Sequence, residues 1–314
     1  MKISVMYPKS EFTQDQQKRL TSLGETNFTT SIDEYPLKEL IKLAKNSDIL
    51  AFANENIGGF EVAHDRLFEL MECMPKLRGL ALATTSFGFV EKDYCLKRNI
   101  IVTNVPYYST ESVAEHTIAL LLGCSKKIFL SDRREQNGKF KFEIGYDLKG
   151  KTLGVIGLGH IGTRTAELGK AIGMKVIAWN RTPKKIDGIE MKLFDEVLSQ
   201  SDAVTLHVTH NNETIGIISQ EKIALLKKGA ILINTADRFL VDENTIAQAL
   251  KSGAVDSYAL EAEDLNAPPL GKVENAFMFK PFAWYTKEAL ARNLEIWIDN
   301  IEGIIKGHPI NPIF

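Results

Sequence analysis

The feature that most constrains the fold is a turn with three glycines, set between an apolar run and a helical pattern. The turn reads GLGHIG over residues 157–162, and the helical pattern follows over 163–172. Gly157 permits a tight turn, Gly159 lets a ligand approach the backbone, and Gly162 lets the helix pack closely on the strand. A second apolar run, MKVIAWN, comes next. This order of strand, glycine turn, helix and strand predicts a Rossmann-type α/β domain.

The same turn predicts a ligand. Backbone N–H groups at the start of a helix attract the negative charge of a diphosphate, so we expect binding of a nicotinamide dinucleotide. The residues of the turn that we expect at the cofactor are Gly157, Gly159, His160, Ile161 and Gly162.

The end of the second strand bears on the choice of cofactor. Dinucleotide-binding folds usually carry an acid there, which holds the ribose hydroxyls. Here the strand ends in Asn180, Arg181 and Thr182, so no carboxylate repels a 2′-phosphate and two side chains are candidates to bind one. We expect NADP to be preferred to NAD, although a solvated loop arginine would give the same sequence.

Short apolar runs alternate with amphipathic stretches along the 314 residues, which favours an α/β class with parallel sheets and two domains. A net charge of −2 gives no general attraction to nucleic acid or anionic membranes. No apolar stretch approaches a membrane span, and the N-terminus has no signal-peptide layout. Cys73, Cys95 and Cys124 are too few and too widely spaced for a disulfide framework or a metal site. We expect buried thiols in a cytoplasmic protein that acts on a small molecule.

Three further segments have a predicted conformation. Residues 109–130 have a helical apolar pattern, with Ser109 as the expected N-cap. Residues 132–150 are polar and glycine-bearing, which indicates an exposed loop. Residues 286–306 form an amphipathic pattern that ends at Gly307, a residue suited to a helix C-cap.

With these motifs in view, the chain resembles the D-isomer-specific 2-hydroxyacid dehydrogenases, particularly the glyoxylate/hydroxypyruvate reductase branch. The resemblance covers nearly the whole chain. It rests on NVPYYSTESVAEH at residues 104–116, GAILINTA at 229–236, LVDE at 240–243 and AWYT at 283–286.

The resemblance implies an organisation for the whole chain. A substrate domain would comprise residues 1–101 plus 288–314, and an NAD(P)-binding domain, residues 102–287, would be inserted into it. Both would be Rossmann-like, with the active site in the cleft and a homodimer formed through the cofactor domains. Thr235 and Ala236 would run under the nicotinamide, and Glu261 would lie near its amide.

The resemblance fails at the residues that do the chemistry. Reduction of a 2-oxoacid needs a cation for the carboxylate and carbonyl, a proton donor, and a carboxylate that tunes the donor. The family supplies Arg, His and Glu, whereas this chain has Asp237, Pro281 and Asn266 at those positions. A backbone bulge would bring Arg238 to the place of the arginine, but a slip of one residue reverses side-chain direction and needs real distortion.

The histidines of the chain offer no obvious replacement. None of the six is near Pro281 in the sequence. His160 belongs to the glycine turn, and His116 is expected to be a packed helix residue. His207 and His210 follow a strand on the cofactor side, where the family has a His at the first position without a proton-transfer role.

Two hypotheses remain open. In the first, Asp237 disfavours an anionic 2-oxoacid and favours a cationic or neutral substrate such as an imine or amino-ketone. Lys280, with a pKa lowered by burial, or Tyr107 or Tyr285 would then give the proton, and the candidate catalytic residues are Asp237, Arg238 and Lys280. A solvent-facing Lys280 is the simpler interpretation of that residue. In the second hypothesis, the protein binds cofactor without turnover, as a sensor or subunit. We expect the first: a nicotinamide-dependent reductase with a non-standard substrate or mechanism.

Overall fold

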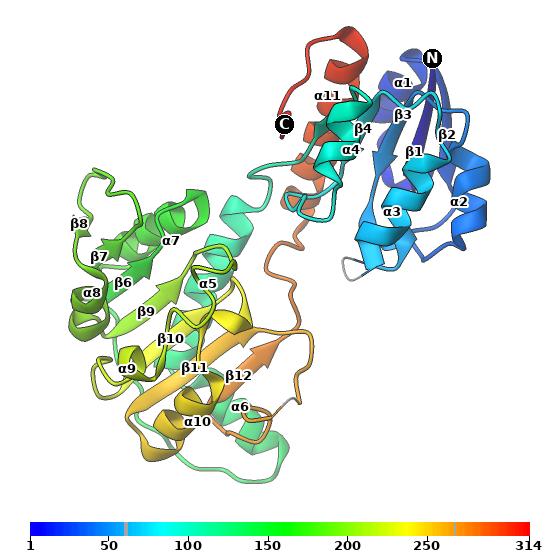
Figure 1. The fold of residues 1–314 in the computed structure, drawn as a ribbon. Helices are drawn as coiled ribbons and strands as arrows, with labels where there is room; N and C mark the ends of the chain where they lie inside the picture. Colours follow the sequence, from blue (N-terminus) through cyan, green and yellow to red (C-terminus); the bar gives the residue numbers. More distant parts are fainter. Residues whose placement is uncertain (60–61, 267) are drawn as a thin grey trace. The chain divides into compact units, whose positions relative to one another are not determined.

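The computed structural model describes residues 1–59, 62–266 and 268–314. These residues form two compact units. Unit 1 comprises Met1–Tyr108 and Lys287–Phe314, and unit 2 comprises Ser109–Thr286. Each unit has its own parallel sheet, so the predicted α/β class with two Rossmann-like units is correct (Figure 1).

The first predicted domain boundary is wrong by several residues. A break after residue 101 would cut strand β5 (Ile101–Thr103), which pairs in parallel with β4 (Gly79–Leu82) inside unit 1. The chain leaves unit 1 only after Tyr108. The second break lies between residues 286 and 287, one residue before the predicted position.

Unit 1 has a five-stranded sheet in the order β2-β1-β3-β4-β5. Besides β4 and β5, its strands are β1 (Lys2–Pro8), β2 (Glu25–Thr29) and β3 (Ile49–Phe52), and its helices are α1 (Gln14–Ser22), α2 (Leu37–Ala44), α3 (Ala63–Glu72), α4 (Lys92–Lys97) and α11 (Lys287–Lys306). Leu40 of α2 and Leu67 of α3 belong to one buried cluster, whereas Leu20 of α1 and Trp297 of α11 belong to another. The sheet is therefore covered on both faces. Helix α11 ends as predicted, with Gly307 at a φ of +76°.

Unit 2 has a seven-stranded parallel sheet in the order β12-β11-β10-β9-β6-β7-β8. The strands are β6 (Thr152–Ile156), β7 (Lys175–Trp179), β8 (Glu190–Met191), β9 (Ala203–Leu206), β10 (Ala230–Asn234), β11 (Val255–Glu261) and β12 (Ala276–Phe279). The helices are α5 (Thr110–Ser125), α6 (Ile128–Gln136), α7 (His160–Ala171), α8 (Phe194–Gln200), α9 (Gln220–Ile223) and α10 (Glu243–Ser252). The chain builds outward from β6 through β7 to β8, then returns to the other side of β6 with β9. Ligands of such folds bind at the carboxyl ends of the strands, beside this reversal.

The central strands β9 and β10 of unit 2 are buried along their whole length, as expected of parallel strands covered on both faces. Ile231 and Ile233 of β10 face a cluster that includes residues of α5 and α7, while Leu232 faces a cluster that includes residues of α8 and α10. Figure 1 shows helices on both sides of this sheet. The packing fixes the carboxyl ends of β6, β9 and β10 side by side.

The helix predicted over residues 109–130 is two helices. Lys127 has a φ of +58°, and it separates α5 from α6. Ser109 is the N-cap residue of α5, but its side chain makes no capping hydrogen bond. The predicted loop over 132–150 is also shorter, because α6 continues to Gln136. The break reflects local backbone geometry, which an apolar pattern does not report.

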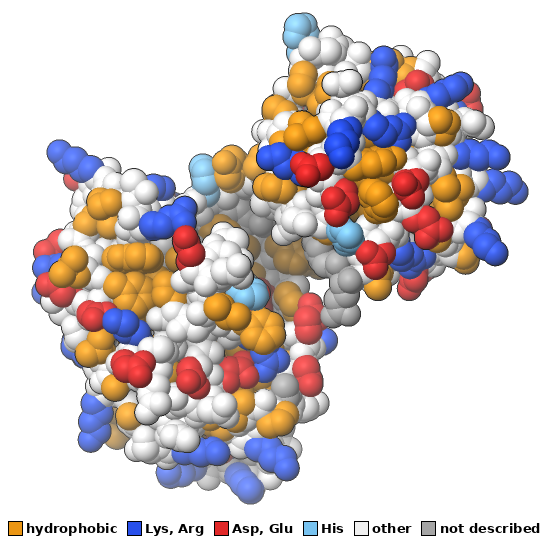
Figure 2. Space-filling view, in the orientation of Figure 1, with side chains coloured by type: hydrophobic (Ala, Val, Ile, Leu, Met, Phe, Trp, Pro, Cys, Tyr) orange, Lys and Arg blue, Asp and Glu red, His pale blue; other side chains and the backbone are white. Residues whose placement is uncertain are grey.

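Two remaining features are the distribution of charge on the surface and the burial of the cysteines. On the face shown in Figure 2, basic and acidic side chains of the described residues are interspersed. No helix among the described residues is long and apolar enough to cross a membrane. Cys95 and Cys124 are buried as expected, but Cys73 is exposed, because it caps the end of α3.

Candidate functional site

The glycine turn joins β6 to α7 and depends on two close backbone contacts. A Cβ atom at Gly157, where φ is +96°, would lie 2.5 Å from the carbonyl oxygen of His207. A Cβ atom at Gly162 would lie 1.9 Å from the carbonyl oxygen of Gly157. These distances exclude any side chain, so both glycines are required by the packing of the turn itself.

Gly159 differs from its two neighbours in the motif. It is the N-cap of α7, its φ is −70°, and no heavy atom lies within 4 Å of the position that a Cβ would take. A side chain would therefore fit the protein but fill the space in front of the helix N-terminus. Helix α7 begins at His160, three residues earlier than predicted, so the N–H groups of its first turn border this space. The arrangement fits a diphosphate.

His207 lies against the same turn. Burial lowers the pKa of its imidazole to about 4, so the ring is neutral near pH 7. Its buried Nε2 has no hydrogen-bond partner within the described part of the chain. A buried polar atom without a partner beside an open cradle is a feature that a bound ligand would complete.

The segment after β7 is tied back to the glycine turn. The Oδ1 of Asn180 accepts a hydrogen bond from the N–H of Leu158 at 2.8 Å, and its Nδ2 donates to the carbonyl of Thr182 at 2.7 Å. Arg181 is exposed and pairs with Glu213 at 3.0 Å. The strand thus ends in an amide that holds the glycine turn, where a carboxylate is usual, and the exposed guanidinium of Arg181 lies next to it.

Asp237 follows β10 and is held in place by three neighbours. Its Oδ1 accepts from the N–H of Phe239 at 2.8 Å, and its carbonyl accepts from the side-chain amide of Asn234 at 2.8 Å. Its Oδ2 lies 3.1 Å from Nδ1 of His210, which is in the loop after the neighbouring strand β9. Two side chains that are 27 positions apart in the sequence therefore meet at the carboxyl edge of the sheet.

Arg238 takes no part in this cluster. Its Nε and Nη2 donate to the two carboxylate oxygens of Glu243 at 3.0 and 2.7 Å, and both side chains are largely buried. Strand β10 keeps a regular register with β9 through Asn234, and beyond the strand the guanidinium of Arg238 is held by Glu243. Instead, the arginine fastens the turn after β10 to the first turn of α10.

Lys280 and Tyr285 are both exposed. The Lys280 side chain is 59% exposed, its Nζ donates to the carbonyl of Glu263, and it lies 3.5 Å from that residue's carboxylate. Tyr285 is 61% exposed. Lys280 is thus solvent-facing, and it lacks the burial that the proton-donor hypothesis requires. Tyr107, also exposed, belongs to unit 1.

Glu261 organises the turn in which the resemblance places the family's histidine. Its Oε1 accepts hydrogen bonds from the N–H groups of Phe282 and Ala283 at 2.7 and 2.8 Å, and burial raises the pKa of its carboxyl. The ring of His116 packs edge-on against Phe282, with centroids 5.1 Å apart, and burial lowers the pKa of the imidazole. Pro281 itself has no group that can transfer a proton.

Thr235 and Ala236 lie where β10 ends. The hydroxyl of Thr235 is 3.1 Å from that of Thr117 in α5, and the N–H of Ala236 donates to the Oδ1 of Asn234 at 3.1 Å. The strand end is thereby fixed to α5 behind it.

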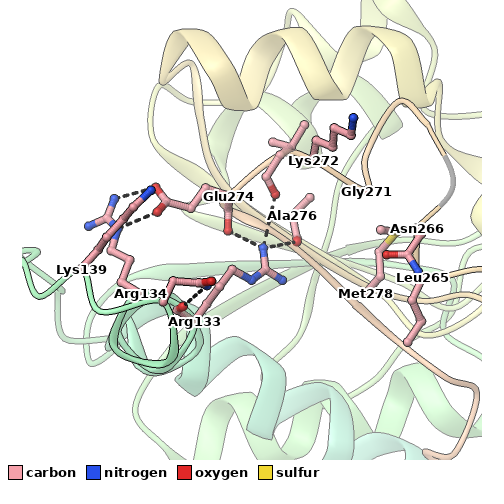
Figure 3. A pocket seen from close by; sticks show the side chains of 12 residues that line it. Arg133, Arg134, Lys139, Leu265, Asn266, Gly271, Lys272, Glu274, Ala276 and Met278 are labelled. Carbon is pink, nitrogen blue, oxygen red and sulfur yellow. Dashed lines mark hydrogen bonds and ion pairs between the residues drawn. The ribbon is translucent and has the colours of Figure 1, made fainter.

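A separate pocket lies beside the edge strand β12 (Figure 3). Arg133, which lines this pocket, is engaged with the protein backbone. It donates to the carbonyls of Val273, Glu274 and Ala276 at 3.3, 2.6 and 3.0 Å. Asn266, at the position expected for the family's Glu, lines this pocket. The pocket contains none of the other predicted site residues.

Comparison with known proteins identifies the family. Residues 118–281, just over half of the chain, match the model of the D-isomer-specific 2-hydroxyacid dehydrogenase NAD-binding domain. A hydroxypyruvate reductase of Blautia hydrogenotrophica is 31% identical over 311 residues, with 94% of each chain covered. The chain belongs to the D-isomer-specific 2-hydroxyacid dehydrogenase family. The predicted resemblance is confirmed.

Two further similarities refine this result. D-3-phosphoglycerate dehydrogenase of Archaeoglobus fulgidus is 34% identical over 252 residues, and the match spans only 48% of that protein's length. The structure of an acyclic imino acid reductase, Bsp5, in complex with NADPH and D-Arg is similar over 100% of both chains, with 27% identity and a TM-score of 0.84. The chain is therefore a nicotinamide-dependent oxidoreductase of this family, and the comparisons do not favour the non-catalytic alternative.

The contact between His210 and Asp237 was missed at the level of sequence. The signal that would have found it is topological. In a Rossmann-type sheet the fourth and fifth strands are neighbours, so residues that closely follow β9 and β10 must meet at one edge.

The different environments of the glycines predict different outcomes of substitution. Gly159→Val should abolish NADPH binding while the melting temperature stays close to that of the wild type, because its side chain fills only the open space. Gly162→Ala should lower both binding and melting temperature, because its Cβ collides with a backbone oxygen. Fluorescence titration and thermal unfolding of the two variants test this. Equal affinity of wild type and Gly159→Val for NADPH would show that the cofactor lies elsewhere.

Proposed function

We propose that this protein is an NADP-dependent reductase whose substrate is an imine or another neutral or cationic carbonyl equivalent, such as an amino-ketone, in place of a simple 2-oxoacid. The observation that carries the proposal is Asp237. This carboxylate stands where the family resemblance places an arginine, and it is fixed at the carboxyl edge of the sheet by Phe239, Asn234 and His210.

Charge is the first argument for this substrate class. A 2-oxoacid needs a cation for its carboxylate, and the two nearby candidates in unit 2 are engaged elsewhere, Arg238 with Glu243 and Lys280 with Glu263. The Asp237–His210 pair carries at most zero net charge. Such a pair gives no net attraction to an anion, whereas it can accept the N–H of a protonated imine.

Chemistry is the second argument. Bound reduced nicotinamide supplies a hydride to an electrophilic carbon. A carbonyl oxygen becomes anionic as this happens, so it requires a strong cation or proton donor. An imine nitrogen is far more basic, and its protonated form becomes a neutral amine without a build-up of negative charge. Loss of the arginine and histidine of the family is more compatible with an imine than with a ketone.

The similarity to the acyclic imino acid reductase supports the same substrate class. That protein was solved with NADPH and D-Arg, a cationic amino acid, and it is similar to this chain along the full length of both. We therefore extend the proposal to imino acids, whose protonated imine nitrogen offsets the charge of their carboxylate and whose reduction gives amino acids. Unit 1 would supply the substrate-binding residues, and unit 2 the cofactor site.

Within unit 2, each part of the cofactor has a proposed set of contacts. Gly157, Gly159, His160, Ile161 and Gly162 would hold the diphosphate; Asn180, Arg181 and Thr182 the adenosine end; and Thr235, Ala236 and Glu261 the nicotinamide end. At the adenosine end, Asn180 adds no negative charge, and Arg181 must leave Glu213 to reach a 2′-phosphate. A surface ion pair is weak enough for this exchange.

A homodimer completes the proposal. Phe140, Phe142 and Ile144 are 66%, 86% and 93% exposed, and they alternate along one extended segment of unit 2. Large apolar side chains clustered on a surface are typical of an interaction site. The segment follows α6 and belongs to the cofactor-binding unit, where the family resemblance places the subunit contact.

The proposed preference for NADPH can be tested by changing either residue of the Arg181–Glu213 ion pair. Arg181→Ala should weaken NADPH binding more than NADH binding, because only NADPH carries the 2′-phosphate. Glu213→Gln should tighten NADPH binding and leave NADH unchanged, because it releases Arg181. Fluorescence titrations with both cofactors measure these effects. A wild type that binds NADH at least as tightly as NADPH would contradict the preference.

Substrate class can be tested by forming imines in the assay. Reduction of pyruvate or glyoxylate with NADPH should be slow alone and should rise with added methylamine, which converts the oxoacid to its imine. Asp237→Arg should lose this amine-dependent rate. The matched control Asp187→Arg makes the same charge change at an exposed site and should behave as the wild type. Rapid turnover of the oxoacids without amine would overturn the proposed substrate class.

The dimer can be tested with a pair of exposed isoleucines. Ile144→Asp should convert a dimer to a monomer, whereas Ile215→Asp, at a side chain that is 57% exposed elsewhere in unit 2, should not. The reason is that a buried unpaired carboxylate destabilises an interface. Size-exclusion chromatography with light scattering gives the mass. A monomeric wild type at micromolar concentration would argue against the dimer.

A further inference from the structure

We infer that His210, oriented by Asp237, is the proton donor of this enzyme and replaces the histidine that the family carries at the position of Pro281. The inference rests on the proposed reductase function. It assigns the proton transfer to a pair at the carboxyl ends of β9 and β10, on different elements from those that the family resemblance indicates.

The geometry of the pair is that of an oriented acid. Nδ1 of His210 lies 3.1 Å from Oδ2 of Asp237, and the other oxygen of that carboxylate is occupied by the N–H of Phe239. The ring of Phe239 also packs beside the imidazole, with centroids 5.6 Å apart. The Asp237 carboxylate is thus held by a backbone N–H group. The His210 imidazole is held by that carboxylate and by the ring of Phe239. With Nδ1 engaged, Nε2 is the ring nitrogen left for a substrate.

The location of the pair matches the reactive end of the cofactor. The glycine turn follows β6, and β9 and β10 lie next to it in the sheet. A dinucleotide with its diphosphate at that turn extends its nicotinamide across the carboxyl ends of these two strands. The His210 side chain is 36% exposed, so it is accessible, and Asp237 is 31% exposed.

The surroundings leave Asp237 as the charged partner of His210. On the turn after β10, Arg238 is neutralised by Glu243 of α10. On the loop of His210 itself, Glu213 is paired with Arg181. Asp237 therefore orients the imidazole through Nδ1.

The step balances with the groups named. His210 gives the proton on its Nε2 to the nitrogen of the neutral imine, which forms the N–H bond and leaves the imidazole neutral. The hydride that bound reduced nicotinamide would supply then forms the new C–H bond at the substrate carbon, and the π electrons of C=N become the lone pair of the neutral amine. The reduced cofactor would leave this step oxidised. Solvent then reprotonates the imidazole.

The kinetic test compares two histidines that each pair with carboxylates. His210→Gln should reduce kcat by about a hundredfold to ten-thousandfold, as loss of a general acid does. His64→Gln, at an exposed histidine of unit 1 that pairs with Asp65 and Glu91, should leave it unchanged. In the wild type, kcat/KM should fall as the pH rises, and this dependence should be absent in His210→Gln. NADPH affinity should be the same in all three proteins.

A second readout does not depend on turnover. The ring 15N signals of His210, identified by their absence from His210→Gln, should move when NADP+ and D-arginine are added, whereas those of His64 should not. Unmoved His210 signals, or a His210→Gln enzyme with wild-type rate and pH profile, would overturn the inference. If the wild type reduces plain 2-oxoacids and no imine, the proposed substrate class fails. Loss of that activity in His210→Gln would still support the donor.

Discussion

The cofactor unit depends on one close approach, between the carbonyl of Gly157 and the backbone of Gly162. A single Cβ at Gly162 would come within 1.9 Å of that oxygen. Because the gap is so small, only three residues separate the end of β6 from the start of α7, whose N-terminus borders the open space at Gly159. The positions of the other site residues follow, since the parallel sheet places the ends of β9 and β10 beside this turn.

Most of the fold could be predicted because its signals are local or periodic. A few adjacent residues determine each of three features: the glycine turn, the apolar strands and the helix that ends at Gly307. The domain boundary near residue 101 could not be placed in this way, because β5 is fixed by its pairing with β4. The break between α5 and α6 was missed for a related reason. Lys127 adopts a positive φ, which a lysine in the sequence does not predict.

The chemistry of the site was harder to predict, since it depends on which neighbouring group each side chain contacts. Arg238 is adjacent to the position of the family arginine, yet its guanidinium is taken by Glu243, five residues later. Lys280 contacts Glu263 at the surface. Sequence identifies such residues as candidates, but competition among nearby carboxylates decides which cation remains available. His210 shows the opposite case: a residue of no special pattern gains a partner through strand order.

The exchange of an arginine for Asp237 changes more than one contact. An arginine at this edge gives a fixed positive charge at any physiological pH. The Asp237–His210 pair instead places a carboxylate beside an imidazole, so it adds no fixed positive charge. On the proposed function, such a site suits a substrate that can take a proton from the imidazole. An imine nitrogen and an imidazole have comparable basicity, whereas a ketone oxygen does not hold a proton near neutral pH. The strand order that pairs His210 with Asp237 and the basicity of an imine therefore both support the proposed class of reaction.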